Sequence, residues 1–485
     1  MVPNRPAVSP PPQMGVAPLE KHFHQLQFRV QAGYWRVHSA RTLFGDKEAT
    51  VMVFERKNNV KAPPRIGRMN KFALVDLIKY EVGQLSSLAH PRILHVQHAL
   101  EDTKEFLAFA TEAVCASLDT VVVEEGIERL EMKLGVLQLR AVFSNSCKLF
   151  YDHTSPAIGA YLAKDDRPQP AGVVLWCGGY LVCFTLTRRR SPIIDGLSYL
   201  HNSAKILHGN LTPASIYVTT SRLWKIAGFS FAVAAKEPDC YPCYPWTKKL
   251  PPILQPDLDF LAPEYLAPNQ QTVTSAADVF SLGVLICWIY AGGKRLIDAK
   301  NNLETHAIIC GQLNEALNCI SEELGSNLKE SMSKVLSMDV EIRPTVQLLA
   351  LIKHFDDPAL SALRQLDDIS QVFDPSQKAH FLGQTLCTAL QVIPENIWFS
   401  RVLPRFNEQL FDSHELFSAL VKPLFFMLDH CESHNIHKLR TWMRKILDHT
   451  TQKPVYVYRI QPALLRASSR SCTFTRGTDN SIATT

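Results

Sequence analysis

The sequence lacks a concentrated excess of charge of either sign. Its net charge is +5 over 485 residues, and its basic runs are short, such as the three arginines at 188–190. Nucleic-acid-binding proteins more often cluster Lys and Arg on one face, so binding to nucleic acid is not expected. The first residues, 2–12, are rich in proline and have no long apolar core, which excludes a signal peptide.

Cysteine pairs with metal-binding spacing are scarce. The 12 cysteines lie scattered in apolar runs, which is typical of reduced, buried thiols in a cytosolic protein. Cys240 and Cys243 form the one C-x-x-C, and a zinc site needs a second pair. We therefore expect no metal site, and we interpret this pair as a loop feature.

The order of the expected elements indicates an α+β fold. Residues 49–54 and 106–112 have strand-like composition, whereas the apolar spacing in 74–88 and 277–290 predicts helices. From about residue 356 onward only short amphipathic helices are expected. We predict a flexible leader over 1–29, a two-lobed domain over 30–355, an all-α HEAT-like array over 356–450 and a disordered or aberrant tail over 451–485.

The most specific chemical signal is the stretch HGNLTPAS at 208–215. It resembles the catalytic loop of protein kinases, H-R-D-L-x-x-x-N, whose Asp accepts the substrate proton and whose Asn holds a metal ion. Asn210 stands in the place of that Asp, and Ser215 in the place of that Asn. An amide cannot take up a proton at neutral pH, and a neutral hydroxyl is a poorer magnesium ligand. The pattern predicts a kinase frame with its chemistry removed.

Later motifs follow in kinase order and spacing. The sequence AGFS at 227–230 lies where kinases carry Asp-Phe-Gly, so Gly228 replaces the metal-binding Asp. Glu264 ends an intact A-P-E motif, Asp278 opens a D-V-x-S-L-G helix start, and Arg343 matches the late arginine of kinases. The resemblance implies that Glu264 and Arg343 pair to hold the C-lobe, so both are expected to be structural.

The ATP site of the N-lobe is degenerate. Phe54 stands where kinases carry the ATP-anchoring lysine of V-A-I-K, and Glu81 matches the helix glutamate that would pair with it. Without the lysine, this carboxylate has lost its partner. Gly33 is the one glycine left near the expected Gly-rich loop, whose glycines allow the backbone to approach phosphate.

Within the kinases, the chain resembles the Scy-like pseudokinases over about residues 30–139 and 194–450. The HGNLTP wording, the long proline-containing stretch before A-P-E and the helices after the kinase-like domain carry this resemblance. It implies a cytoplasmic scaffold, peripheral on clathrin-coated vesicles between the trans-Golgi and endosomes, with clathrin and its adaptor complexes as partners. In that family the binding motifs for these partners lie mostly in a long C-terminal tail, which this sequence does not include.

Residues 140–193 do not resemble any kinase. Deleting them joins 133–139 to 194–201 as one amphipathic helix, so they interrupt a core helix, whereas natural insertions concentrate in exposed loops. A retained intron or gene-model error is the interpretation we favour. A genuine disordered insert is an alternative, and so is a short transmembrane helix over 171–187, although no membrane span is expected.

The sequence therefore predicts a catalytically inactive scaffold in clathrin-dependent trafficking, with no cofactor required. The competing hypothesis is a weak atypical Ser/Thr protein kinase that still binds ATP. A third possibility is that the interrupted helix prevents a stable protein.

Overall fold

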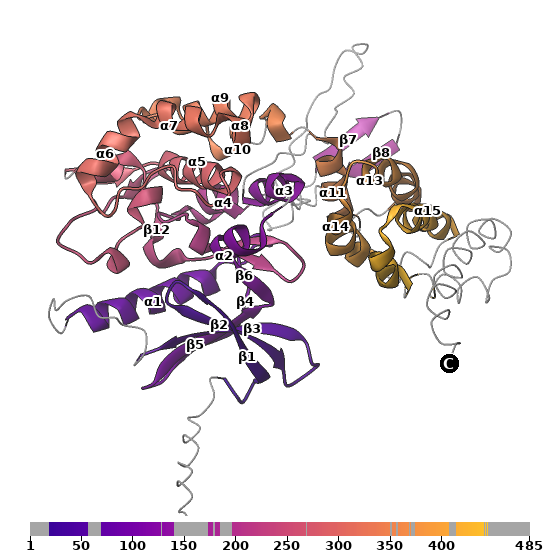
Figure 1. The fold of residues 1–485 in the computed structure, drawn as a ribbon, viewed down its shortest axis with the longest axis horizontal. Helices are drawn as coiled ribbons and strands as arrows, with labels where there is room; N and C mark the ends of the chain where they lie inside the picture. The colour runs from indigo at the N-terminus through magenta and orange to yellow at the C-terminus, as the bar shows by residue number, and fades with distance from the viewer. Residues whose placement is uncertain are drawn as a thin grey trace, which may run out of the picture.

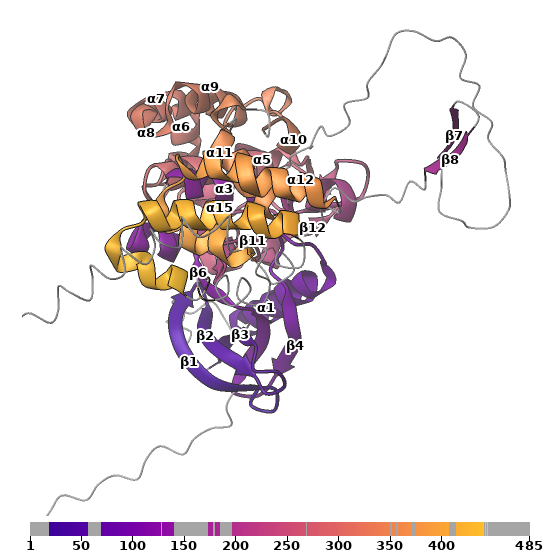
Figure 2. The same ribbon diagram turned by 90° about the vertical axis from the view of Figure 1, so that its right-hand side faces the viewer.

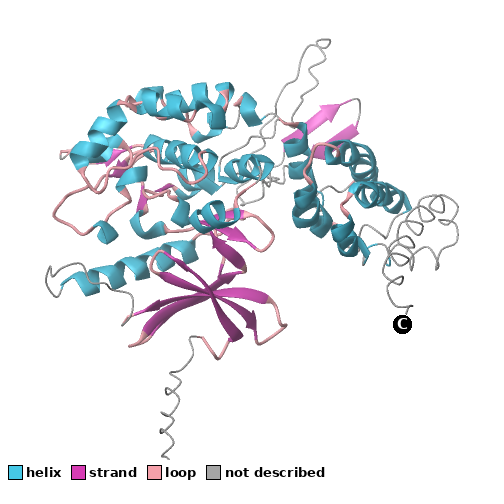
Figure 3. Ribbon diagram, in the orientation of Figure 1, coloured by secondary structure: helices cyan, strands magenta, loops and turns pink. Residues whose placement is uncertain are grey.

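A β-sheet lobe, a mostly helical lobe and a further group of helices make up the molecule, so the predicted α+β class is confirmed (Figures 1 and 3). The computed structural model describes residues 19–56, 69–127, 129–139, 173–177, 180–184, 196–267, 269–349, 352–355, 357–367, 369, 374–406, 414–440, 442 and 444.

The N-lobe is an antiparallel five-stranded sheet packed against one long helix, α1. The strand order is β1-β2-β3-β5-β4. The apolar face of α1, including Ile78, Val82 and Leu85, packs into the same core as Trp35 and Met52 of the sheet. The bounds are β1 Phe23–Ala32, β2 Trp35–Thr42, β3 Glu48–Glu55, α1 Met69–Ser87, β4 Val96–Asp102 and β5 Phe106–Glu112.

The first strand corrects the expected domain boundary. β1 begins at Phe23, inside the range 1–29 that the sequence assigned to a flexible leader. It is an edge strand, and most of its middle residues are exposed, so it carries little of the apolar alternation by which a strand is recognised. Residues 1–18 of the predicted leader lie outside the described residues, as does the predicted tail 451–485.

The C-lobe surrounds helix α5, which is almost completely buried. Small sheets lie between it and the N-lobe, and shorter helices cover its other side (Figure 1). The strands are β6 Val114–Ser117, β9 Ile206–Leu207, β10 Ile216–Thr219, β11 Trp224–Ile226, β12 Val233–Ala234, β13 Tyr241–Pro242 and β14 Thr272–Val273. The helices are α2 Leu118–Thr120, α3 Arg129–Leu139, α4 Gly196–Tyr199, α5 Ala276–Tyr290, α6 Leu303–Gly311, α7 Leu313–Cys319, α8 Ser321–Leu324, α9 Ser326–Val335 and α10 Val346–Leu349.

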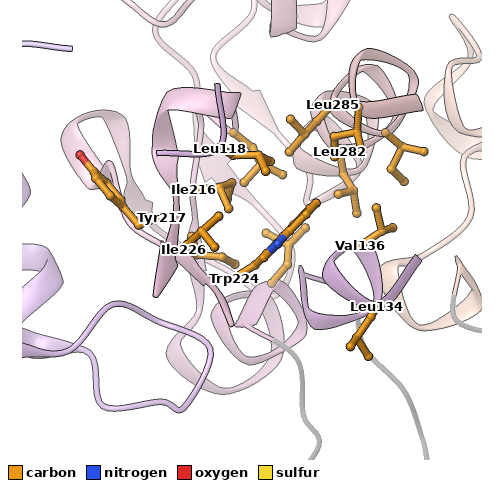
Figure 4. Packing of buried hydrophobic residues seen from close by; sticks show 14 of the residues in the cluster. Leu118, Leu134, Val136, Ile216, Tyr217, Trp224, Ile226, Leu282 and Leu285 are labelled. Atoms are coloured by element: carbon orange, nitrogen blue, oxygen red, sulfur yellow. The ribbon is translucent and has the colours of Figure 1, made fainter. Parts of the chain in front are cut away.

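Trp224 lies at the centre of this lobe and is fully buried. Figure 4 shows its indole pointing toward Val136 of α3 and Leu282 of α5. Helix α3 approaches so closely that a Cβ added at Gly135 would lie 2.3 Å from the indole ring. A side chain at residue 135 would therefore displace the largest residue of this core.

Further helices follow the C-lobe and pack beside α3 rather than standing apart (Figures 1 and 2). Lys133 of α3 forms a 3.0 Å ion pair with Asp357, directly before α11. Helix α15 then packs across α12 and α13. The HEAT-like arrangement over 356–450 stays a prediction. The bounds are α11 Pro358–Asp367, α12 Pro375–His380, α13 Cys387–Leu390, α14 Glu395–Ile397 and α15 His414–His430.

The interrupting segment contributes one described feature, a hairpin. Strands β7 Val173–Cys177 and β8 Tyr180–Phe184 pair antiparallel. They stand apart from both lobes in Figure 2. This apolar run was the one we weighed as a transmembrane helix, and that alternative is wrong, because the two strands turn back on each other. No helix in the described parts of the chain is long and apolar enough to cross a bilayer.

We propose that residues 140–193 are dispensable for the fold, and we expect their deletion to raise the midpoint of thermal unfolding. The deletion would join the end of α3 to residue 194. It would remove the entropic cost of closing a long loop. Each kcal/mol gained should raise the midpoint by roughly 2–4 °C in a domain of this size. Differential scanning calorimetry of the two proteins measures the change.

Deletion of 451–485 is the control for shortening the chain, because it touches no described residue. A lower midpoint after deletion of 140–193 alone would show that this segment contributes to the folded domain.

Candidate functional site

A cavity of about 460 Å³ lies between the two lobes. The turn between β1 and β2 forms one wall and α1 another, while the stretch predicted as a catalytic loop and the proline-rich loop before Glu264 complete it. The residues that line the cavity include Gly33, Tyr34, Trp35, Glu81, Asn210, Ser215, Tyr217, Gly228, Ser230, Phe231, Asp257, Asp259, Arg295, Asp298 and Lys300.

A buried carboxylate fixes the backbone of the loop at 208–215. Asp278, at the start of α5, accepts hydrogen bonds from the backbone N–H groups of His208 (2.7 Å) and Gly209 (2.9 Å). Its Oδ2 also lies 2.9 Å from Nε2 of His201. Burial alone would raise the pKa of Asp278, but the hydrogen bond and charge of His201, with the Gly209 N–H, lower it below its usual value. The carboxylate is therefore held ionised.

Asn210 holds a neighbouring loop in place. Its Oδ1 accepts a 2.9 Å hydrogen bond from the backbone N–H of Asp257. Its own N–H donates to Nδ1 of His208. The side-chain oxygen at the position of the kinase base thus anchors the proline-rich loop to the catalytic-loop backbone.

The two positions that carry metal ligands in kinases also face each other here, without carboxylates. The hydroxyl of Ser215 donates to the carbonyl of Thr212 (2.8 Å) and accepts from the N–H of Thr212 (3.0 Å). Ser215 therefore acts as donor and as acceptor within its own turn. Gly228 has a φ of +72°, and a Cβ at this residue would lie 2.7 Å from Cβ of Ser215. An aspartate at 228 would require both a strained backbone and movement of Ser215.

The remaining N-lobe positions offer nothing for phosphate. Phe54 is buried in the core, and its ring makes an edge contact with that of Tyr34, with the centroids 6.3 Å apart. Ala32 pairs with Trp35 across the hairpin, so Gly33 and Tyr34 form the whole turn, with a positive φ at Gly33. Among the described N-lobe residues that line the cavity, none carries a cationic side chain.

Glu81, which lacks the lysine partner of kinases, accepts hydrogen bonds from other side chains of the cleft. Its carboxylate accepts hydrogen bonds from the hydroxyls of Tyr34 and Ser230, and Nε1 of Trp35 lies 3.4 Å from Oε1. The two hydroxyls also contact each other at 2.9 Å. Burial raises the pKa of Glu81 to about 7, although the hydrogen bond from Ser230 opposes that shift. This cluster joins the β1–β2 turn, α1 and the segment after Gly228.

Glu264 and Arg343 form a two-pronged ion pair that ties the end of the proline-rich loop to the C-lobe. The Nη1 to Oε1 and Nη2 to Oε2 distances are 2.7 and 3.0 Å. The guanidinium also lies 4.9 Å from the ring centre of Phe280 and donates to the carbonyl of Ser337. Parallel bonds of this kind are strong because both charges are desolvated and aligned.

Comparison with known proteins places this geometry in a family. The protein kinase domain family matches residues 186–355. Human SCY1-like protein 2 is 28% identical over 377 residues, which cover 76% of this chain and 35% of that protein. Protein kinase domain-containing protein ppk32 of Schizosaccharomyces pombe is 28% identical, covering 83% and 48% of the two chains. These matches support a Scy-like member of the protein kinase family.

A more distant relative of this Scy-like chain is the protein kinase-like protein SCY1 of Saccharomyces cerevisiae, which is 23% identical over 61% of the chain and 32% of that protein. The Scy-like chain spans less than half the length of these curated relatives. The predicted kinase-like domain with a β-sheet N-lobe is confirmed.

Reasoning from the sequence of the Scy-like chain missed several cleft residues. Tyr34, Trp35 and Ser230 complete the hydrogen bonds of Glu81, and Tyr217 lines the cavity beside them. The available signal was their adjacency to motif positions, since Tyr34 follows Gly33 and Ser230 ends the AGFS motif. In the part of the chain that the structure describes, no three His, Cys, Asp or Glu side chains are grouped to hold a metal. Cys240 and Cys243 are both free thiols.

The pKa of Glu81 should make the stability of the Scy-like fold pH-dependent. Burial raises the pKa of Glu81 from its ordinary value of 4.5 to about 7 in the folded state. The stabilising contribution of the protonated group is therefore complete below about pH 4.5 and is lost as the pH rises through 7. Glu81→Gln removes the titration and keeps the shape. From about pH 5 to about pH 8, the variant should therefore gain about 1–3 kcal/mol relative to the unmodified protein.

Urea denaturation of both proteins across this pH range measures the difference. Glu330→Gln, at an exposed position on α9, is the matched control and should follow the unmodified protein. Parallel curves of stability against pH for Glu81→Gln and the unmodified chain would contradict the raised pKa of Glu81.

Proposed function

We propose that this chain is a catalytically inactive, kinase-like scaffold that acts in clathrin-dependent vesicle traffic between the trans-Golgi and endosomes. The proposed inactivity is supported by one observation. The groups at the working positions of the cleft form hydrogen bonds that hold the chain together. Asn210 anchors Asp257, and both roles of the Ser215 hydroxyl are used in its own turn. A catalytic base and a metal ligand would have to be free to meet a substrate.

The charge of the cavity also supports an inactive cleft. Four carboxyl side chains line it, from Glu81, Asp257, Asp259 and Asp298, against the cations of Arg295 and Lys300. Arg295 is paired with Asp259, which leaves little positive charge to attract a nucleoside triphosphate. With Phe54 in place of the lysine, a polyphosphate would enter a site of its own sign.

The trafficking role rests on the resemblance to the Scy-like pseudokinases, whose partners are clathrin and its adaptor complexes. The helices from α11 onward, fastened to the C-lobe through Lys133 and Asp357, provide a second surface beside the kinase-like domain. In this proposal, partners bind to these surfaces at the cytoplasmic face of coated vesicles, and the cleft has no part in their recruitment.

A weak atypical Ser/Thr kinase that binds ATP is the second candidate. It is favoured by the persistence of an open cavity and by the intact frame around Asp278, which would position a substrate-binding loop. Binding of ATP separates the two proposals.

We expect ATP with magnesium to leave the thermal midpoint unchanged. A ligand at 100 times its dissociation constant would stabilise the folded state by about 2.7 kcal/mol, so even weak binding is detectable at millimolar ATP. An active protein kinase titrated under the same conditions is the positive control. A dose-dependent rise for this chain would contradict the empty-cleft proposal and favour the second candidate.

We expect a tagged form of the full chain to copurify with clathrin-coated vesicles, and we expect a form ending at residue 355 to be lost from them. Glu81→Gln, inside the cleft, should copurify as well as the unmodified chain. Quantitative blotting of isolated vesicles measures all three. Equal recovery of the shortened form would show that the helices after the C-lobe are not the docking surface, and absence of the full chain would contradict the trafficking role.

A further inference from the structure

The cleft combines net negative charge with aromatic walls. Tyr34, Trp35, Tyr217 and Phe231 line the same cavity as the carboxyl groups of Glu81 and Asp257. Trp35 and Tyr217 are buried, and the rings of Tyr34 and Trp35 lie 5.5 Å apart at an angle of 56°. Tilted aromatic surfaces beside a carboxylate are the arrangement that binds organic cations, because the ring faces and the carboxylate attract the same charge.

Among the described residues, no cation pairs with Glu81. The hydrogen bonds to its carboxylate come from uncharged donors, the hydroxyls of Tyr34 and Ser230 and the indole of Trp35. Glu81 is 6% exposed, so water offers little compensation. A buried carboxylate is stabilised most by a cation that brings both charge and hydrogen-bond donors.

The same residues do not form a phosphate site. Phe54 removes the cation, and Gly33 and Tyr34 form a turn of two residues. The volume of about 460 Å³ nevertheless lies within the range of small-ligand pockets, about 300–1,000 Å³. The cavity has therefore kept the size of a ligand site while the sign of its charge favours a different ligand.

We propose that the cleft binds an organic cation with a guanidinium or ammonium head, for which Glu81 is the counter-ion and Tyr34, Trp35 and Tyr217 are the aromatic walls. This inference rests on the proposed function, because it requires that no nucleotide occupies the cleft. The cation can be a free small molecule or the arginine or lysine side chain of a protein other than clathrin and its adaptors, and both present the same chemistry to Glu81.

The test compares arginine amide with citrulline amide, which has nearly the same shape and an uncharged head. Calorimetric titration of the full chain at about pH 8, where the Glu81 carboxyl is mostly ionised, should detect binding of arginine amide only. Glu81→Gln should weaken that binding by about 10-fold or more, which corresponds to about 1.4 kcal/mol. Glu330→Gln, on the exposed face of α9, should bind like the unmodified protein.

Equal titration by the two amides, or full binding by a folded Glu81→Gln variant, would overturn the proposal. A thermal scan of the variant without ligand establishes that it is folded. A short peptide containing arginine, compared with its citrulline counterpart, distinguishes the sources, since tighter binding of the peptide than of arginine amide assigns the cation to a protein partner. Stabilisation by ATP would contradict the proposed function. If ATP does not bind and arginine amide does not bind either, only the proposed cation site is contradicted.

Discussion

The loop at 208–215 depends on one buried carboxylate. Asp278 accepts two consecutive backbone N–H groups and contacts His201, and all of these groups are buried away from water. Two N–H groups without acceptors would each cost the free energy of an unmade hydrogen bond, and removing one partner of a buried charged pair costs about 3–5 kcal/mol. The position of Asn210, which directly follows Gly209, depends on the path that Asp278 imposes on this loop.

This dependence explains which kinase-like features persist and which do not. Asp278 and Arg343 are buried, and Arg343 pairs with the half-buried Glu264, so the loss of these contacts would lower the free energy of unfolding whether or not the protein is an enzyme. At two positions of the degenerate site, other side chains stand where kinases carry working residues. At 210 an amide serves as the acceptor for Asp257, and at 54 an aromatic ring fills the core, so these side chains stabilise the chain without requiring a ligand. A scaffold needs the first group of residues and not the second.

The sequence was sufficient for elements whose pattern is strong, and insufficient where a tertiary contact decides. Strand β5 has the bounds 106–112 that its composition predicted, and α5 covers the expected 277–290 with one more residue at its start. Helices α6 and α7 are separated at Gln312, whose φ of −112° no local pattern revealed. The partners of Glu81 were equally hidden, since Tyr34 and Ser230 are 47 and 149 residues distant in sequence and meet it only in the folded chain.

The core contains α3 and α4 where the sequence predicts one continuous helix interrupted by residues 140–193. Each half has its own anchor on strand β11, at which the backbone approaches without an intervening side chain. Gly135 of α3 lies against the indole of Trp224, and Gly196 of α4 lies against Ile226, where an added Cβ would be 2.8 Å from the isoleucine side chain. Close packing at both places fixes each half independently of the covalent link between them. The core therefore depends on the two contacts with β11 more than on helical continuity.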